Sequence, residues 1–226
     1  MKKSILALCA FSLAASLAAC GGGTSSYTVG GTVSGLQYGP LVLLTNGMEV
    51  SLQPKPDASG NPTVITYAFP KQLDYGEAYA VTLKKIGTDS SGNPTYQQPP
   101  HQVCGPSSDP TSRTAETAGR LSVINASFVC DLASHAIGGT IEGLTADGLK
   151  LTNGSNPNIV VAAKDTTTGA YPTIFLFPDP VVYNQSYGVT VLEQPTGQTC
   201  TVSNGSGIMG DDPIGTIAVK CVAKPT

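Results

Sequence analysis

The residues in this sequence best suited to chemistry are its cysteines, because a thiol can be acylated, oxidised to a disulfide or bound to a metal ion. Cys9 and Cys20 lie near the N-terminus, and four more follow in the body of the chain: Cys104, Cys130, Cys200 and Cys221. Their spacings contain no C-x-x-C pair, and neither histidine stands beside them in a ligand pattern. Disulfides are therefore favoured over a zinc site, which remains the weaker alternative.

The segment before Cys20 has the composition of an export signal. Lys2 and Lys3 precede an apolar run from Ile5 to Leu17, and the small residues Ala18 and Ala19 stand directly before Cys20. This pattern resembles the export signal of bacterial lipoproteins, which implies cleavage before Cys20 and acylation of its thiol and new amino group. A transmembrane helix is the alternative, but a run of about 13 residues is short of the roughly 20 that span a bilayer. We expect residues 1–19 to be a lipoprotein signal peptide.

Residues 20–26 continue as Cys-Gly-Gly-Gly-Thr-Ser-Ser. Such a Gly/Ser run is typical of a flexible tether. A lipoprotein anchor of two or more acyl chains, palmitate among them, holds a protein stably on its membrane. Gly21 after the cysteine favours the outer membrane, by resemblance to enterobacterial sorting rules. We expect a protein of the bacterial cell envelope, on the periplasmic face or the cell surface.

Few other residues in the sequence could take part in catalysis or bind a metal ion. The sequence has no G-x-S-x-G, H-E-x-x-H or P-loop motif, and His101 and His135 have no partners for catalysis in the sequence. Asp211 and Asp212 could bind calcium as paired carboxylates, although a polar turn before Pro213 is the favoured interpretation. The sequence predicts no cofactor, no metal and no catalytic residue.

Two further aspartates begin a repeated turn motif. Asp57 and Asp89 each start D-x-S-G-N-P-T. Aspartate at such a position commonly accepts hydrogen bonds from backbone amides of the same turn. We predict that both are turn formers.

The composition excludes some partners and favours an all-β fold. The net charge is −3, and removal of residues 1–19, which hold two lysines and no acid, makes it −5. Charged residues make up only 12% of the chain, so no basic face is available for nucleic acid. The chain has 26 Gly, 17 Pro and no Trp, which favours short strands joined by tight turns, with helix content near zero.

The chain also contains two copies of one pattern. With an offset of 108 residues, YTVGGTVSGL at 27–36 returns as HAIGGTIEGL at 135–144, and YGEAYAVTL at 75–83 returns as YNQSYGVTV at 183–191. QPPHQVC, which ends at Cys104, returns as QPTGQTC, which ends at Cys200, with an offset of 96. The first copy therefore has about 12 extra residues near 86–97. We expect two domains, the first copy at residues 27–131 and the second copy at residues 135–223.

The repeat favours one pairing of the cysteines and argues against the calcium site. It selects Cys104 with Cys130 and Cys200 with Cys221 among the three possible pairings. The first copy has no counterpart of the Asp211-Asp212 pair, which favours the turn over the calcium site.

Alternating side chains define the strands. Tyr79, Val81 and Leu83 should face inward, as should the second cysteine of each pair. Each copy has about seven such runs, in the first copy at 27–34, 40–45, 47–53, 63–69, 77–85, 96–104 and 120–130. Turn signals such as Asn46-Gly47 and Asn204-Gly205 separate them. We expect each cysteine pair to join the last two strands of an immunoglobulin-like sandwich that lacks the antibody-type Trp.

These motifs carry a family resemblance. GGTVSGL, YxVTV, QPTGQTC followed by TVSNGSG, and a closing VKC resemble the tandem module of proteobacterial surface lipoproteins, over nearly all of residues 27–222. The first copy departs from it at 104–120, where a longer loop replaces TVSNGSG. A looser similarity to transthyretin-like modules implies the same sandwich. Neither resemblance implies catalytic residues.

Two functional hypotheses follow. The favoured one is a non-enzymatic, lipid-anchored envelope protein that serves as a structural or adhesin-like binding module, with a protein or glycan ligand that the sequence does not specify. The alternative is an envelope hydrolase that acts on polysaccharide through scattered carboxylates, which needs two of them about 5 to 9 Å apart in a cleft.

Overall fold

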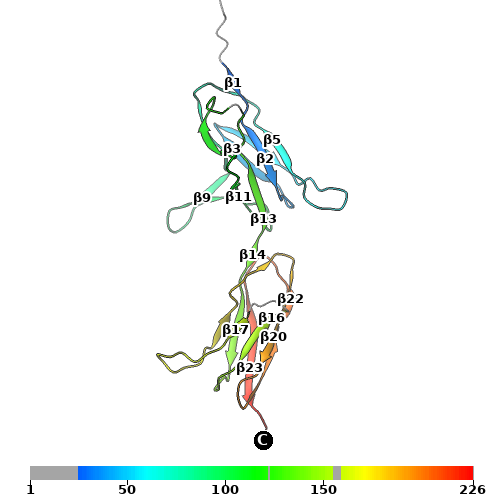
Figure 1. The fold of residues 1–226 in the computed structure, drawn as a ribbon, viewed down its shortest axis with the longest axis vertical. Coiled ribbons are helices and arrows are strands. Elements are labelled where there is room, and N and C mark those ends of the chain that lie inside the picture. Colours follow the sequence, from blue (N-terminus) through cyan, green and yellow to red (C-terminus); the bar gives the residue numbers. More distant parts are fainter. Residues whose placement is uncertain (1–24, 122, 155–158, 226) are drawn as a thin grey trace, which may run out of the picture.

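The computed structural model describes residues 25–121, 123–154 and 159–225, and the expected signal peptide and Cys20 lie outside these ranges. The described residues form strands, turns and irregular segments, with no helix among them, so the all-β prediction is confirmed. The described chain is elongated, with β1 at one end and the C-terminus at the other (Figure 1).

The strands of the first copy form a sandwich. They are β1 (Ser26–Tyr27), β2 (Gly30–Ser34), β3 (Leu41–Thr45), β4 (Met48–Leu52), β5 (Ile65–Ala68), β6 (Leu73–Asp74), β7 (Ala78–Ala80), β8 (Thr82–Leu83), β9 (Lys85–Thr88), β10 (Pro94–Tyr96), β11 (Gln102–Pro106), β12 (Ala115–Thr117) and β13 (Phe128–Leu132). One sheet has the order β11-β13-β2-β5, and the other has the order β4-β3-β8. Val33 and Phe128 of the first sheet and Leu43 of the second are almost fully buried in one core, so the two sheets pack face to face.

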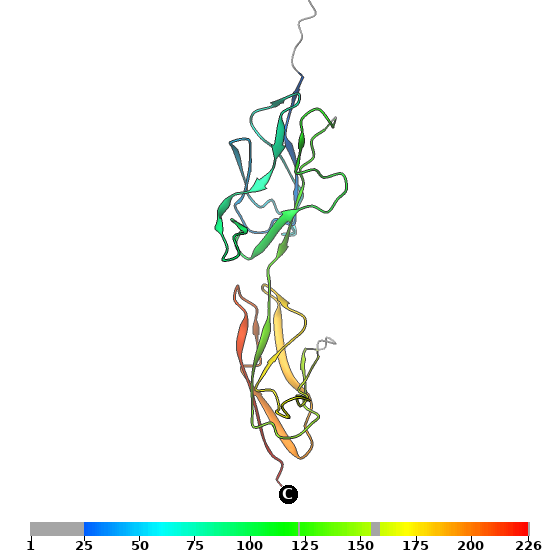
Figure 2. The ribbon, with the colours of Figure 1, turned by 90° about the vertical axis from the view of Figure 1, so that its left-hand side faces the viewer.

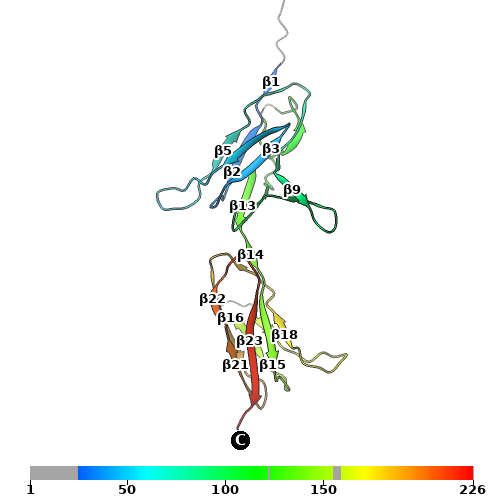
Figure 3. The same cartoon turned by 180° about the vertical axis from the view of Figure 1, so that it is seen from behind.

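The second copy repeats this plan with a core of its own. Its strands are β14 (Ser134–His135), β15 (Ile137–Glu142), β16 (Lys150–Asn153), β17 (Ile159–Val161), β18 (Ile174–Leu176), β19 (Val181–Val182), β20 (Ser186–Glu193), β21 (Gln198–Ser203), β22 (Ser206–Ile208) and β23 (Ile214–Ala223). The sheets have the orders β18-β15-β23-β21 and β17-β16-β20-β22, and the first of them is seen in Figure 3. Ile137 and Ile217 of the first of these sheets and Leu151 of the second belong to one buried core.

No sheet of the described chain contains strands from both copies. Figure 2 shows the two copies stacked end to end, with a single crossing of the chain between them. In each copy an early strand pairs in parallel with the last strand, β2 with β13 and β15 with β23. The first and last parts of each copy thus lie side by side in one sheet. The chain then passes to the next copy along the long axis.

The alternation of side chains agrees with the sequence prediction. Tyr79, Val81 and Leu83 are buried, whereas Ala80 and Thr82 between them are exposed. The Asn46-Gly47 turn joins β3 to β4 with positive φ at both residues, as a type I′ hairpin requires.

Some of the strand predictions need correction. The run 96–104 is not one strand, because β10 ends at Tyr96 and β11 begins at Gln102 after a Pro-rich turn. The extra residues of the first copy form the β9–β10 hairpin, which projects from the sandwich (Figures 1 and 3). The cysteines do not join the last two strands, because β12 and β22 lie between the cysteine strands in the sequence and pair with β7 and β20.

Candidate functional site

The four cysteines of the body of the chain form two disulfides. Cys104 bonds to Cys130 and Cys200 to Cys221, which are the pairs that the internal repeat indicates. In each pair the cysteines are direct partners on antiparallel strands, β11 with β13 and β21 with β23. Each disulfide therefore lies within one sheet and does not join the two sheets as an antibody disulfide does. All four cysteines are buried.

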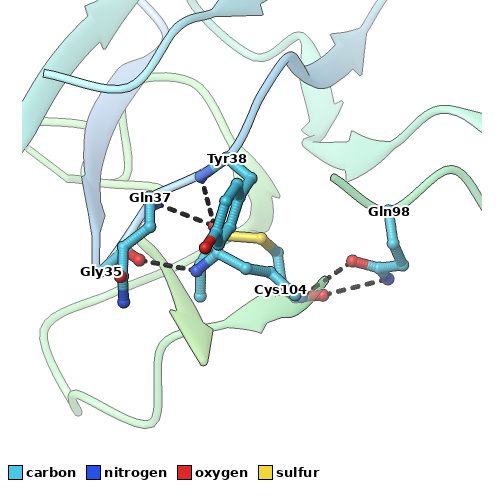
Figure 4. Close-up of a disulfide and its surroundings, with 7 residues drawn as sticks. Gly35, Gln37, Tyr38, Gln98 and Cys104 are labelled. Atoms are coloured by element: carbon cyan, nitrogen blue, oxygen red, sulfur yellow. Dashed lines mark hydrogen bonds between the residues drawn. A yellow bond between two sulfur atoms is a disulfide. The ribbon is translucent and has the colours of Figure 1, made fainter. Parts of the chain in front are cut away.

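In each copy a glutamine side chain forms hydrogen bonds with the backbone of the first cysteine of the disulfide, and Figure 4 shows those of the first copy. The amide group of Gln98 accepts a hydrogen bond from the Cys104 backbone N–H at 2.8 Å and donates to its carbonyl oxygen at 3.3 Å. Gln194 makes the same two bonds with Cys200, at 2.7 and 3.0 Å. This glutamine, six residues before the cysteine, thus has a structural role in both copies.

A second glutamine holds a tight turn against the disulfide strand. Gln102 accepts from the backbone N–H groups of Gln37 and Tyr38 and donates to the Gly35 carbonyl oxygen, all at 2.8 Å (Figure 4). Gln198 likewise accepts from Thr145 and donates to Gly143, at 2.8 and 2.7 Å. The repeated Q-x₃-Q-x-C pattern therefore satisfies buried backbone groups and leaves no amide in it for chemistry.

The paired glycines of the repeat allow strands to approach closely. A β-carbon on Gly31 would lie 2.2 Å from the Ala126 carbonyl oxygen, and one on Gly139 would lie 1.9 Å from that of Ile217. No larger residue fits there without a shift of the backbone. The residues that the two copies share are thus used mainly to build the sandwich.

Asp57 and Asp89 form turns, as predicted. One carboxylate oxygen of Asp57 accepts from the N–H groups of Ser59 and Asn61 at 2.8 Å, and Asp89 makes the same bonds with Ser91 and Asn93 at 2.9 Å. These hydrogen bonds, the one from the Asn backbone first, lower the pKa of each aspartate because they favour the ionised form.

Asp211 has a partner that sequence reasoning missed. The Nδ1 atom of His101 lies 2.7 and 2.8 Å from its two carboxylate oxygens, although 110 residues separate them. The described residues contain no group of three or more His, Cys, Asp or Glu side chains that could hold a metal ion. The geometry therefore gives Asp211 a role in joining the two copies.

Aromatic rings complete this joint. The His101 ring stacks on Tyr183 with the ring centroids 4.0 Å apart and an angle of 9° between the planes. Tyr38 meets both rings edge-on, at 4.8 Å from His101 and 5.9 Å from Tyr183. We call His101, Tyr38, Tyr183 and Asp211 the joint cluster. It unites two residues from each copy.

The connecting segment is fixed by the same loop. The backbone N–H of Ala133 donates to the His101 carbonyl oxygen at 2.8 Å, and its carbonyl oxygen accepts from Tyr183 at 2.7 Å. Ala133 is thus hydrogen-bonded to both copies. The short connection and the joint cluster together hold the copies end to end.

His101 has a backbone conformation that is unusual for a residue with a side chain. His101 has a φ of +60°, a conformation in which residues other than glycine are uncommon. Its counterpart in QPTGQTC is Gly197, with a φ of +70°. A histidine in a glycine position is the one sequence signal that could have pointed to the joint, since strained residues gather where a local contact requires them.

His135 has no catalytic partner in the described chain. It lies in β14, in register with Val181 of β19. Its Nε2 atom is buried and has no hydrogen-bond partner among the described residues. This matches a packing role at a position that Tyr27 fills in the first copy.

Three surface pockets bear on the hydrolase alternative. Their volumes are about 330, 220 and 300 Å³. The first is lined by Leu36, Gln37, Tyr38, Gly60 and three prolines, the second by residues around the Cys104 disulfide, and the third by residues around Tyr27. None of the three is lined by an aspartate or glutamate, so none offers the two converging carboxylates that glycoside hydrolysis needs.

Comparison with known proteins adds little to this description. No protein-family model and no curated protein matches the chain. Among solved structures, the chain is similar to the major pilin proteins T-13 and T3.2 of Streptococcus pyogenes, at 11% identity in both cases. The matches cover 88% and 87% of this chain and 96% of each pilin, with TM-scores of 0.22 and 0.21. Such scores carry no argument about function. No helix among the described residues is long and apolar enough to cross a membrane.

Proposed function

We propose that this chain is a non-enzymatic, lipid-anchored protein of the bacterial cell envelope. In this proposal Cys20 carries the lipid, residues 20–26 form the tether, and the two copies are β-sandwich domains of the tandem lipoprotein module. They form a short rod that supports or presents a binding surface away from the outer membrane.

The joint cluster is the observation that carries this proposal. A histidine at positive φ, its hydrogen-bond contact with the Asp211 carboxylate and stacked rings are placed where the two copies meet, and nothing comparable is assembled in the three pockets. A contact of this kind fixes the direction of one copy relative to the other. Fixed direction benefits a spacer or a presenting module, whereas catalysis requires reactive groups in a cleft.

The two ends of the rod suit the same role. The described chain begins at the end that holds β1 and finishes at the opposite end (Figure 1). A lipid on Cys20 would therefore hold the first copy next to the membrane and place the second copy farthest from it. The shared Gly, Gln and Cys residues support a common framework in both copies.

Fractionation of Cys20→Ser tests the anchor. Without the thiol the protein cannot be acylated, so it should move from the membrane pellet to the soluble fraction. Cys9→Ser is the matched control, because it lies in the expected signal peptide and should leave the mature protein on the membrane. A Cys20→Ser protein that still sediments with membranes in high salt would refute the anchor.

A further inference from the structure

The two copies have equivalent ends, and among the described residues only the end of the second copy is covered by the other copy. Tyr183 of the second copy lies in the joint cluster beneath the first copy. With the offset of 108 residues its counterpart in the first copy is Tyr75. The backbone hydrogen bonds agree with this equivalence. The N–H of Tyr183 donates to the Ala133 carbonyl oxygen, and the N–H of Tyr75 donates to that of Ser25, which lies 108 positions before Ala133. Tyr75 thus marks the uncovered counterpart of the joint.

This free end presents apolar side chains to solvent. Tyr75 is 69% exposed, Val123 is 74% exposed and Leu121 is 38% exposed. Val123 lines a pocket of about 300 Å³ together with Tyr27, whose ring centroid is 6.4 Å from that of Tyr75. We call Tyr75, Leu121 and Val123 the proximal patch. Exposed apolar residues gathered in this way commonly mark a contact surface.

The charge at this end also differs from that of the joint. Counting back from the second cysteine of each copy, Arg120 and Leu121 stand where the second copy has Asp211 and Asp212. Arg120 is 70% exposed and pairs with Glu116 at 3.2 Å. The carboxylate that binds His101 at the joint is therefore replaced, and the proximal patch is not built to receive a copy of the His101 loop.

The far end of the second copy, as far as the structure describes it, fits the patch poorly as well. At the far end of the second copy, Gly197 and Ala146 occupy the positions of His101 and Tyr38. That end has neither the ring that stacks on Tyr183 nor the ring that meets it edge-on. A second copy of this chain, joined head to tail, would lack the contacts that hold the two copies together here.

The chain before the patch indicates what covers it instead. Ser25 follows Cys20 by five residues, and five extended residues span at most roughly 18 Å. We propose that the proximal patch rests on the lipid surface in which the Cys20 anchor is embedded. This inference depends on the proposed lipid anchor. Tyrosine suits the boundary between headgroups and acyl chains, since its ring is apolar and its hydroxyl is polar.

The experiment uses the lipidated full chain in vesicles. The protein has no Trp, so Tyr75→Trp and Val123→Trp each introduce a single indole at the patch. Tyr96→Trp, in the β9–β10 hairpin, is the control, because Tyr96 is 37% exposed and is not part of the proximal patch. Each variant is placed in vesicles of phosphatidylethanolamine and phosphatidylglycerol, with and without bromine on the acyl chains. Flotation of the same samples measures membrane attachment.

The inference predicts that bromine quenches both patch variants several-fold more than the Tyr96→Trp control. Variants that float without quenching at the patch would overturn the inference and leave the lipid anchor intact. Equal quenching of all three would overturn it too, because the rod would then lie flat. Dimers of unquenched protein would assign the patch to a second copy. A chain that does not float would refute the anchor, and the inference with it.

Discussion

At the scale of single residues, side-chain volume near the backbone decides much of this fold. Gly31 and Gly139 lie where two strands approach so closely that a methyl group would overlap a carbonyl oxygen. These glycines belong to the repeated GGT motif, so the motif recurs because no side chain fits at this position in either copy. The sequence showed that the motif recurs, but the neighbouring carbonyl that explains it became visible only in the structure.

We expect Gly139→Ala to destabilise the second copy by roughly 3 kcal/mol, because the new methyl group displaces the backbone at Ile217. Gly215→Ala is the matched control, since Gly215 lies in the adjacent strand β23 and a β-carbon added there would have no atom within 4 Å. Alanine there should be neutral or slightly stabilising. Urea unfolding of both variants measures the difference, and equal stability of the two would contradict the steric explanation.

The turn aspartates predict a response to acid. Hydrogen bonds from their own turns lower the pKa of Asp57 and Asp89 in the folded protein. Such groups stabilise the fold above their unfolded pKa of about 3.9, and that stability is lost as the pH falls through the folded pKa. The pKa values of Asp109 and Asp165 are lowered in the same direction.

We therefore expect the Asp57→Asn/Asp89→Asn double variant to lose less stability than the original protein between pH 5 and pH 2. Asparagine keeps an acceptor oxygen for the turn but does not titrate. Thermal unfolding across this pH range measures the effect, and Asp212→Asn is the control. If the double variant has the same acid sensitivity as the original, the turns do not contribute to it.

At the scale of elements, the sequence predicted the strands better than the connections. Alternating apolar residues such as Val81 and Leu83 identified inward faces, because one face of each sheet is buried. The predicted boundaries were wrong where a Pro-rich turn interrupts 96–104 and where the short strands β12 and β22 lie between the two cysteine strands of each copy. Those features depend on how the sheets pack, and local alternation does not record that.

The glutamines connect these elements, and one of them provides a test. Gln198 is 7% exposed and is bonded to Thr145 and Gly143. Gln198→Ala would leave both backbone groups without this partner, so we expect a loss of about 1 to 3 kcal/mol. Gln185→Ala, at an exposed position, should change stability by less than about 0.5 kcal/mol. Chemical unfolding with intact disulfides compares the two, and equal effects would show that the Gln198 hydrogen bonds are dispensable.

At the scale of the whole molecule, the joint cluster is the feature that sequence reasoning did not find. The repeat indicated two similar copies and a short connection between them. It did not show that His101 would meet Asp211, because that contact depends on the relative orientation of the copies. The clue was the histidine at the position of Gly197, which has meaning only once its positive φ is known.

The final prediction separates the joint from the stability of the copies. His101→Gly restores the residue that the second copy has at this position and removes the cost of a side chain at positive φ, about 1 to 2 kcal/mol. The first copy should therefore be as stable as before or more stable. The joint should nevertheless loosen, since the stacking on Tyr183 and the bond to Asp211 are both lost.

A matched pair of variants isolates the contribution of the Asp211 carboxylate to this contact. Asp211→Asn removes the charge that faces His101, whereas Asp212→Asn changes a neighbouring carboxylate outside the joint cluster. Residual dipolar couplings fitted separately to the two copies measure how closely they share one alignment. We expect the shared alignment to weaken most in His101→Gly, less in Asp211→Asn and not at all in Asp212→Asn. If all three variants kept the original alignment, the connection through Ala133 alone would fix the rod, and the joint cluster would have no part in its stiffness.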